Sequence, residues 1–218
     1  MNSRTIIRMT ISTLLILLAW PAAAQELGEV VEQYRHDLDA LRDFSWKSSV
    51  RFSIDGQLSS TELYEIRYGE DGRLQKTKIA EPEGKAGKSQ KTAEVTLSKV
   101  RDLLDAYTQL EPATFEKMFG SDTLVFRRDE GDGLRRITAR DILHVGDTVE
   151  VWVDSADHRM DKIEITSNLQ KQPVHLVAEF DALQSGVGYV ARSTFETTQG
   201  KKKLVIETKN YDFERRGE

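Results

Sequence analysis

The stretch Thr148-Val-Glu-Val-Trp-Val-Asp154, followed by Met160-Asp-Lys-Ile-Glu-Ile-Thr166, decides the fold. In both runs apolar β-branched residues alternate with other side chains, so each run predicts a strand with one apolar face. The connection over 155–159 is short enough for a hairpin and too short for the crossover that parallel strands need. The two runs therefore predict neighbouring antiparallel strands that cover the same apolar face.

The same two-residue period occurs near the N-terminus. Trp46 to Ile54 alternates, Asp55-Gly56 is a turn signal, and a second alternating run follows over 64–68. Glu70-Asp-Gly-Arg73 then predicts another hairpin into Leu74 to Ile79. This part of the chain is therefore expected to form a meander of short-turned strands.

The C-terminal half continues in the same way. Its further strand-like runs are Asp122 to Arg128, Leu134 to Leu143, Pro173 to Phe180, Val187 to Thr198 and Lys203 to Phe213. Because strands joined by tight turns pair antiparallel, we expect one large and strongly curved antiparallel sheet.

Helical periodicity is confined to a few segments. Apolar residues form one stripe from Gln25 to Leu41, a second helix is expected over 97–107, and a short third one over 112–119. The expected fold class is therefore α+β: an incomplete antiparallel barrel packed on two or three helices.

The N-terminus has the three parts of a secretory signal peptide. Arg4 and Arg8 precede an apolar run over 11–20, and Pro21 is followed by alanines at 22–24. An uncleaved anchor is disfavoured because spanning a bilayer takes about 20 apolar residues. We expect 1–24 to be removed after Ala24, leaving 25–218 as one periplasmic domain without a stable membrane span.

The overall composition excludes several classes of function. The chain has no cysteine, so disulfides, thiolate nucleophiles and Cys-ligated metals are excluded. Its formal net charge is −5, which makes it a poor candidate for binding a nucleic acid backbone. A protein of this size must therefore gain its stability from packing.

No catalytic or cofactor motif stands out. Residues 80–93 predict a mobile loop, and within it Gly84-Lys-Ala-Gly-Lys-Ser89 departs from a phosphate loop because Pro82 stands where the motif needs glycine. Asp154-Ser-Ala-Asp157-His158 is better explained as a turn than as a metal site. Carboxylates such as Glu164 and Glu179 are expected to face outward into solvent. We therefore expect no cofactor, no metal and no enzyme activity.

The apolar face of the expected sheet is the candidate binding site. A curved sheet closed by few helices can leave part of that face as a cavity for an apolar ligand, although a plain hydrophobic core remains the alternative for each residue. The candidate cavity residues are Val50, Phe52, Ile54, Tyr64, Ile66, Tyr68, Val149, Val151, Val153, Ile163 and Ile165.

The run from Thr148 to Thr166, followed by Val174 to Leu183, resembles the C-terminal half of LolA-like periplasmic lipoprotein-carrier proteins. The expected order of signal peptide, opening helix and first strand is similar too. The tail from Gly186 to Phe213 looks more like the uncharacterised, outer-membrane lipoprotein-sorting-like relatives than like the dedicated carrier. The resemblance implies a helix-capped incomplete barrel with a cavity for acyl chains, but the carrier's functional arginine has no counterpart that we can place here.

Three hypotheses follow. The first is a non-enzymatic periplasmic carrier for a lipid, a lipoprotein acyl chain or another apolar ligand. The second is an envelope sensor or assembly factor that binds a protein partner through a sheet edge or the concave face. A hydrolase is the third and is disfavoured, because no acid, base or nucleophile constellation is visible.

Overall fold

A computed structural model of the protein describes residues 28–80, 125–128, 133–142, 145–169 and 172–217. The described part contains one helix over 28–41 and ten strands. The strands are β1 (Phe44–Ile54), β2 (Gln57–Tyr68), β3 (Leu74–Ala80), β4 (Val125–Arg128), β5 (Leu134–Arg140), β6 (Thr148–Asp154), β7 (Met160–Leu169), β8 (Gln172–Ala182), β9 (Gly188–Gln199) and β10 (Lys202–Arg215).

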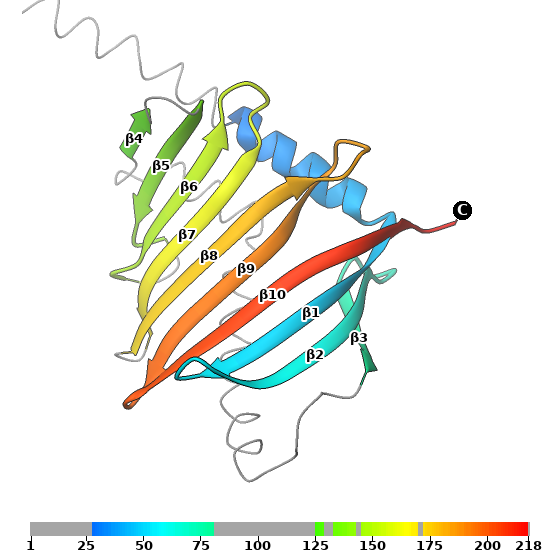
Figure 1. Cartoon of the computed structure of the whole chain (residues 1–218). Helices are drawn as coiled ribbons and strands as arrows, with labels where there is room; N and C mark the ends of the chain where they lie inside the picture. Colours follow the sequence, from blue (N-terminus) through cyan, green and yellow to red (C-terminus); the bar gives the residue numbers. More distant parts are fainter. Residues whose placement is uncertain (1–27, 81–124, 129–132, 143–144, 170–171, 218) are drawn as a thin grey trace, which may run out of the picture.

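All ten strands form one sheet in the order β3-β2-β1-β10-β9-β8-β7-β6-β5-β4 (Figure 1). Every neighbouring pair is antiparallel, and the sheet is not closed because β3 and β4 lie at opposite edges. Among the described strands, those that follow one another in the chain are paired, except for β3 and β4 at the two edges, and β1 also pairs with β10. The predicted curved antiparallel sheet of an α+β fold is thus confirmed.

The predicted number of helices is not supported. The described part of the chain contains only the helix over 28–41, which agrees with the first expected helix. The second and third expected helices, over 97–107 and 112–119, lie outside the described residues, as do the signal peptide and nearly all of the loop at 80–93. The division into a cleaved segment of 1–24 and a single domain of 25–218 remains a prediction.

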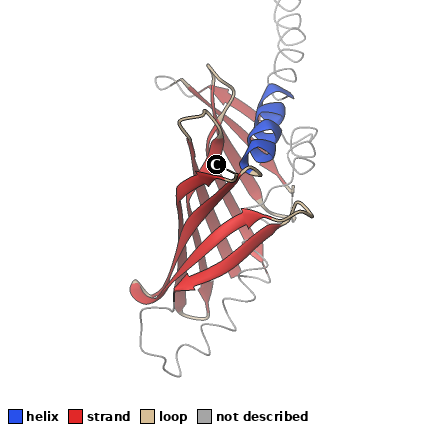
Figure 2. Cartoon of the chain, turned by 90° about the vertical axis from the view of Figure 1, so that its right-hand side faces the viewer, coloured by secondary structure: helices blue, strands red, loops and turns tan. Residues whose placement is uncertain are grey.

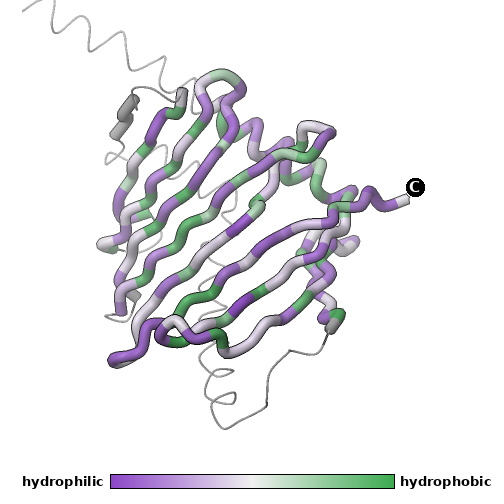
Figure 3. The backbone as a smooth tube through the Cα atoms, in the orientation of Figure 1, coloured by the Kyte–Doolittle hydropathy of each residue, from purple (hydrophilic) through white to green (hydrophobic). Residues whose placement is uncertain are grey.

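Hydrophobic and hydrophilic residues alternate along many stretches of the strands, as the colours of the tube in Figure 3 show. In β6, Val149, Val151 and Val153 are at most 1% exposed, whereas the residues between them are only partly buried. Successive side chains of a strand point to opposite faces, so Val149, Val151 and Val153 share the inward face.

The best buried part of the core is a row of inward side chains that crosses six neighbouring strands. Each member is paired in register with the next, and none is more than 2% exposed. Burying one such side chain contributes about 1.5–3 kcal/mol to folding. The row consists of Val149, Ile165, Leu176, Phe195, Ile206 and Phe52.

The helix lies across the inward face, at the end of the sheet where β1 begins and β10 ends (Figures 1 and 2). Near its start, Glu29 Oε2 lies 3.1 Å from His158 Nε2 in the turn between β6 and β7. Near its end, Asp37 lies against Gly188 at the start of β9. The helix therefore spans several turns at one end of the sheet. No helix in the described ranges has both the length and the apolar character to cross a membrane.

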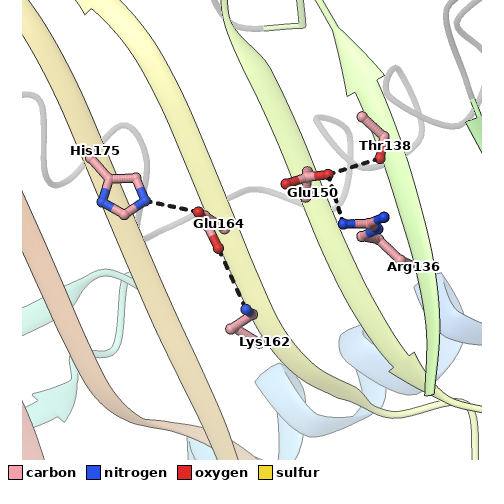
Figure 4. A network of polar contacts seen from close by, with 6 residues as sticks. All are labelled: Arg136, Thr138, Glu150, Lys162, Glu164 and His175. Atoms are coloured by element: carbon pink, nitrogen blue, oxygen red, sulfur yellow. Dashed lines mark hydrogen bonds and ion pairs between the residues drawn. The ribbon is translucent and has the colours of Figure 1, made fainter. Parts of the chain in front are cut away.

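The outward face is covered by polar side chains that pair with one another (Figure 4). Glu164 Oε2 of β7 accepts a hydrogen bond of 3.4 Å from Lys162 Nζ. Its Oε1 lies 2.9 Å from His175 Nε2 of β8. On β6, Glu150 lies 3.7 Å from the Arg136 guanidinium and accepts a hydrogen bond from the Thr138 hydroxyl. These contacts agree with the prediction that Glu164 faces outward as part of a solvated surface.

The contact with His175 holds the pKa of Glu164 below its ordinary value, with a further contribution from Lys162, while partial burial acts in the opposite direction. A lowered carboxyl pKa stabilises the folded state above the unfolded pKa of about 4.3, and this stabilisation is lost as the pH falls through the folded value. Because solvent screens this exposed pair, the effect on stability should be small.

We predict that His175→Ala raises the pKa of Glu164 towards its ordinary value, because the main group that favours the ionised carboxylate is removed. Titration of the side-chain carboxyl by NMR measures this shift. His36→Ala, which removes an exposed histidine of the helix, is the control and should leave the titration unchanged. An identical Glu164 titration in both variants would contradict the assignment of the shift to His175.

Candidate functional site

A cavity of about 1310 Å³ lies between the helix and the inward face of the sheet. Side chains of the helix, of β1, β2, β9 and β10, and of the turns at this end of the sheet line it. Pockets for small ligands usually have volumes of about 300–1,000 Å³. The cavity therefore has room for a ligand larger than most small metabolites.

The hollow exists because small residues occupy inward positions in the middle of the sheet. Ser193 of β9 is paired with Thr208 of β10, and Ser48 of β1 is paired with Asn210 of β10. Further from the helix, the same strands carry Phe195, Ile206 and Phe52 in the buried row. Inward side chains next to the buried row are thus smaller and more polar, and the described residues leave a space beside them.

Four aromatic residues gather at the helix end of the cavity, and we call them the aromatic cluster. Phe213 stacks on Trp46 with ring centroids 5.5 Å apart and an interplanar angle of 16°, and it contacts Tyr189 at 4.3 Å. Trp46 also packs against Tyr68 at 6.0 Å. The cluster joins β1, β2, β9 and β10 and gives this end of the cavity a flat apolar wall.

The tyrosine hydroxyls of the cavity are held in their neutral form. Burial raises the pKa of Tyr34 far above its ordinary value, and a nearby Tyr68 raises it further. Burial also raises the pKa of Tyr68, and that of Tyr189. Neutral phenols add hydrogen-bonding capacity without adding charge.

Charged side chains of the lining come from the helix, from the turns and from strands, among them Lys76 of β3 and Asp154 at the end of β6. Asp154 Oδ1 accepts a hydrogen bond from the Ala156 amide at 2.7 Å, and Asp157 Oδ1 accepts one from the Arg159 amide at 3.1 Å. These bonds agree with the turn that the sequence predicted at this place. Within the described ranges, no group of three or more side chains is arranged to hold a metal ion.

The structure divides the predicted cavity residues into two sets. Val50, Tyr64, Ile66 and Tyr68 line the cavity. The others are not among its lining residues and belong to the core or, for Ile54, pack against it. This second set consists of Phe52, Ile54, Val149, Val151, Val153, Ile163 and Ile165. Alternation identified the inward face correctly but does not show how far along a strand the packing stops.

Sequence reasoning missed much of the lining. The missed residues include the small polar ones on the sheet, namely Ser193, Thr208 and Asn210, and the aromatic residues Tyr189 and Phe213. A signal was present, because serine and threonine stand at inward positions where alternation predicts large apolar side chains. At such a position a polar residue stands where the alternation of the strand calls for an apolar one. Departures of this kind are expected at functional sites.

No protein-family model and no curated protein matches the sequence. Among solved structures, the chain is similar to a DUF1329 family protein from Desulfovibrio piger, with 10% identity over 88% of this chain and 92% of the other and a TM-score of 0.43. A LolA superfamily protein from Nitrosomonas europaea has 12% identity over 87% and 93%, with a TM-score of 0.35. An outer membrane lipoprotein-sorting protein domain from Vibrio parahaemolyticus has 13% identity over 89% and 94%, with a TM-score of 0.43.

The superfamily that the sequence resembles is therefore found among the structural neighbours, at low identity. The names of these structures say what those proteins are and are not carried over to this chain.

The helix forms one side of the cavity. At one point, Asp37 of the helix packs closely on Gly188 of β9. Asp37 is only 8% exposed, and its Oδ1 accepts a hydrogen bond from Gln33 Nε2 at 3.1 Å. A Cβ atom at Gly188 would lie 2.5 Å from Asp37 Oδ2 and 3.1 Å from its Cγ. The absence of a side chain at Gly188 therefore lets the helix pack closely.

We predict that Gly188→Ala destabilises the protein by about 1–3 kcal/mol, because the added methyl group forces Asp37 and the helix away from β9. Urea unfolding measures the loss. Gly28→Ala is the matched control, since a Cβ atom there meets nothing within 4 Å. If the two variants were equally stable, the close packing of the helix on Gly188 would be refuted.

Proposed function

We propose that the protein is a non-enzymatic periplasmic carrier that holds a lipid, or another ligand with a long hydrocarbon chain, in the cavity beneath the helix. The observation that supports this best is the cavity of about 1310 Å³ with the aromatic cluster at one end. Apolar and aromatic residues such as Val50, Ile66 and Phe180 contribute to its lining. A ligand that has no charge along most of its length suits such a site.

Burial of hydrocarbon would supply the affinity. Each methylene group removed from water contributes about 0.8 kcal/mol, so a chain of about ten methylenes gains about 8 kcal/mol before the costs of association. This gain needs no specific polar contact along the chain. The cavity would therefore accept chains of somewhat different length and saturation.

The periplasmic location and the carrier role draw on further features of the sequence. The segment over 1–24 has the pattern of a secretory signal peptide, and the resemblance to LolA-like proteins implies acyl chains as the ligand. The helix forms one wall of the cavity, so a shift of the helix would widen the cavity for a bulky ligand. Its contacts with the turns, such as the one between Glu29 and His158, would then be broken and remade during loading.

Filling the cavity tests this proposal. Val50 of β1 is a lining residue, so Val50→Trp should occupy part of the space and weaken binding of a fluorescent acyl probe such as cis-parinaric acid by about tenfold or more. Fluorescence titration measures the dissociation constant.

Val205→Trp is the matched control, because Val205 of β10 is paired with Ser53 and belongs to the outward face. It should bind the probe as the parent protein does. A parent protein that takes up no acyl probe would refute the carrier proposal and favour a sensor or assembly factor that binds a protein.

A further inference from the structure

Three buried polar atoms in the lining of the cavity have no hydrogen-bond partner among the described residues. They are Trp46 Nε1, Ser48 Oγ and Asn210 Oδ1. Trp46 is 8% exposed and Ser48 is 1% exposed. A polar group that is shielded from water and has no partner destabilises the fold, so native proteins rarely keep one without a reason.

The three residues lie together on the sheet. Ser48 and Asn210 are directly paired in register across β1 and β10, which places their Cβ atoms about 4.5–5.5 Å apart. Trp46 is the next inward residue of β1 towards the helix, and its ring belongs to the aromatic cluster. We call these three side chains the polar floor of the cavity.

The orientation of the Asn210 amide is fixed. Its Nδ2 donates a hydrogen bond of 2.8 Å to the carbonyl oxygen of Val190 on β9. Turning the amide over would place Oδ1 against that carbonyl, which would bring two acceptors together. The buried atom that lacks a partner is therefore Oδ1, which can only accept a hydrogen bond.

The other two residues complete the set. The indole Nε1 of Trp46 is a donor only, and the hydroxyl of Ser48 can donate or accept. The polar floor thus contains one obligate donor, one obligate acceptor and one adaptable group. The partner that satisfies all three must both donate and accept hydrogen bonds, as a hydroxyl or an amide does.

We propose that the polar floor is a subsite for a neutral hydroxyl or amide group carried by the hydrocarbon ligand. This inference rests on the carrier function proposed above and adds the chemistry of the ligand's polar group. A carboxylate fits poorly, because it only accepts and would face Asn210 Oδ1. An ester fits poorly too, because it has no donor for that oxygen.

Shielding from water gives the subsite its selectivity. Hydrogen bonds formed away from water are stronger, and a ligand that leaves such groups unpaired is rejected more strongly than one that merely lacks a methylene. Ligand contact requires a small displacement of the side chains that shield the three atoms, and the adjoining cavity has room for it.

Competition against cis-parinaric acid tests the inference with four ligands of equal chain length: 1-decanol, decanamide, methyl decanoate and decanoate. We expect the alcohol and the amide to bind the parent protein about tenfold more tightly than the methyl ester and decanoate do. Trp46→Phe and Ser48→Ala should each reduce this preference, because each removes one polar atom and keeps most of the side chain's shape.

Trp152→Phe and Ser49→Ala are the matched controls. Trp152 lies on the outward face, where Lys162 Nζ is 3.6 Å from its ring, and Ser49 is the outward neighbour of Ser48. Both controls should retain the preference for the alcohol and the amide.

A second measurement separates ligand binding from a structural role. If the polar floor serves the ligand, Ser48→Ala should leave the unfolding midpoint of the ligand-free protein unchanged or raise it, since it breaks no hydrogen bond within the described structure. Trp46→Phe does not serve in this measurement, because it also removes packing from the aromatic cluster. A lowered midpoint in Ser48→Ala would show a structural role and overturn the inference. Equal binding of all four ligands would overturn the polar subsite alone, whereas failure of every ligand and of the probe would refute the carrier function itself.

Discussion

The pairing of β1 with β10 is the interaction on which the rest of the structure depends. It is the one place in the described sheet where neighbouring strands are far apart in the chain. Without it, the described strands would separate into β1–β3 and β4–β10. The pairing also places Trp46 against Phe213 and Ser48 beside Asn210, so both ends of the described chain build the same wall of the cavity.

The cavity follows from a change of residue size along these central strands. The row through Phe195, Ile206 and Phe52 is closely packed, and the inward positions nearer the helix carry serine, threonine and asparagine. Large apolar residues at those positions would give a better packed and more stable protein. The small polar residues there, and the buried atoms that lack a partner among the described residues, lower the stability of the fold, and the binding role proposed above would account for them.

Local patterns allowed much of the fold to be predicted, because alternation and turn residues act over a few positions. The hairpins around Asp55-Gly56 and the run from Thr148 to Thr166 needed no more than this information. The β1–β10 pairing could not be predicted in the same way, since no local signal says which strand an unpaired edge will meet. The site was only partly predictable for a related reason. Val151 and Val50 share an inward face, but alternation does not show that other side chains bury Val151 completely whereas Val50 lines the cavity.

This topology implies that the cavity forms late in folding. A contact between segments at opposite ends of a chain requires closure of a long loop, which is slow relative to the formation of local hairpins. The hairpins β1–β2 and β9–β10 have local partners and can form early, whereas Trp46 meets Phe213 only after β10 has been added beside β1. The aromatic cluster and the polar floor therefore exist only in the fully assembled sheet, so an incompletely folded chain would not present a formed binding site to a hydrocarbon ligand.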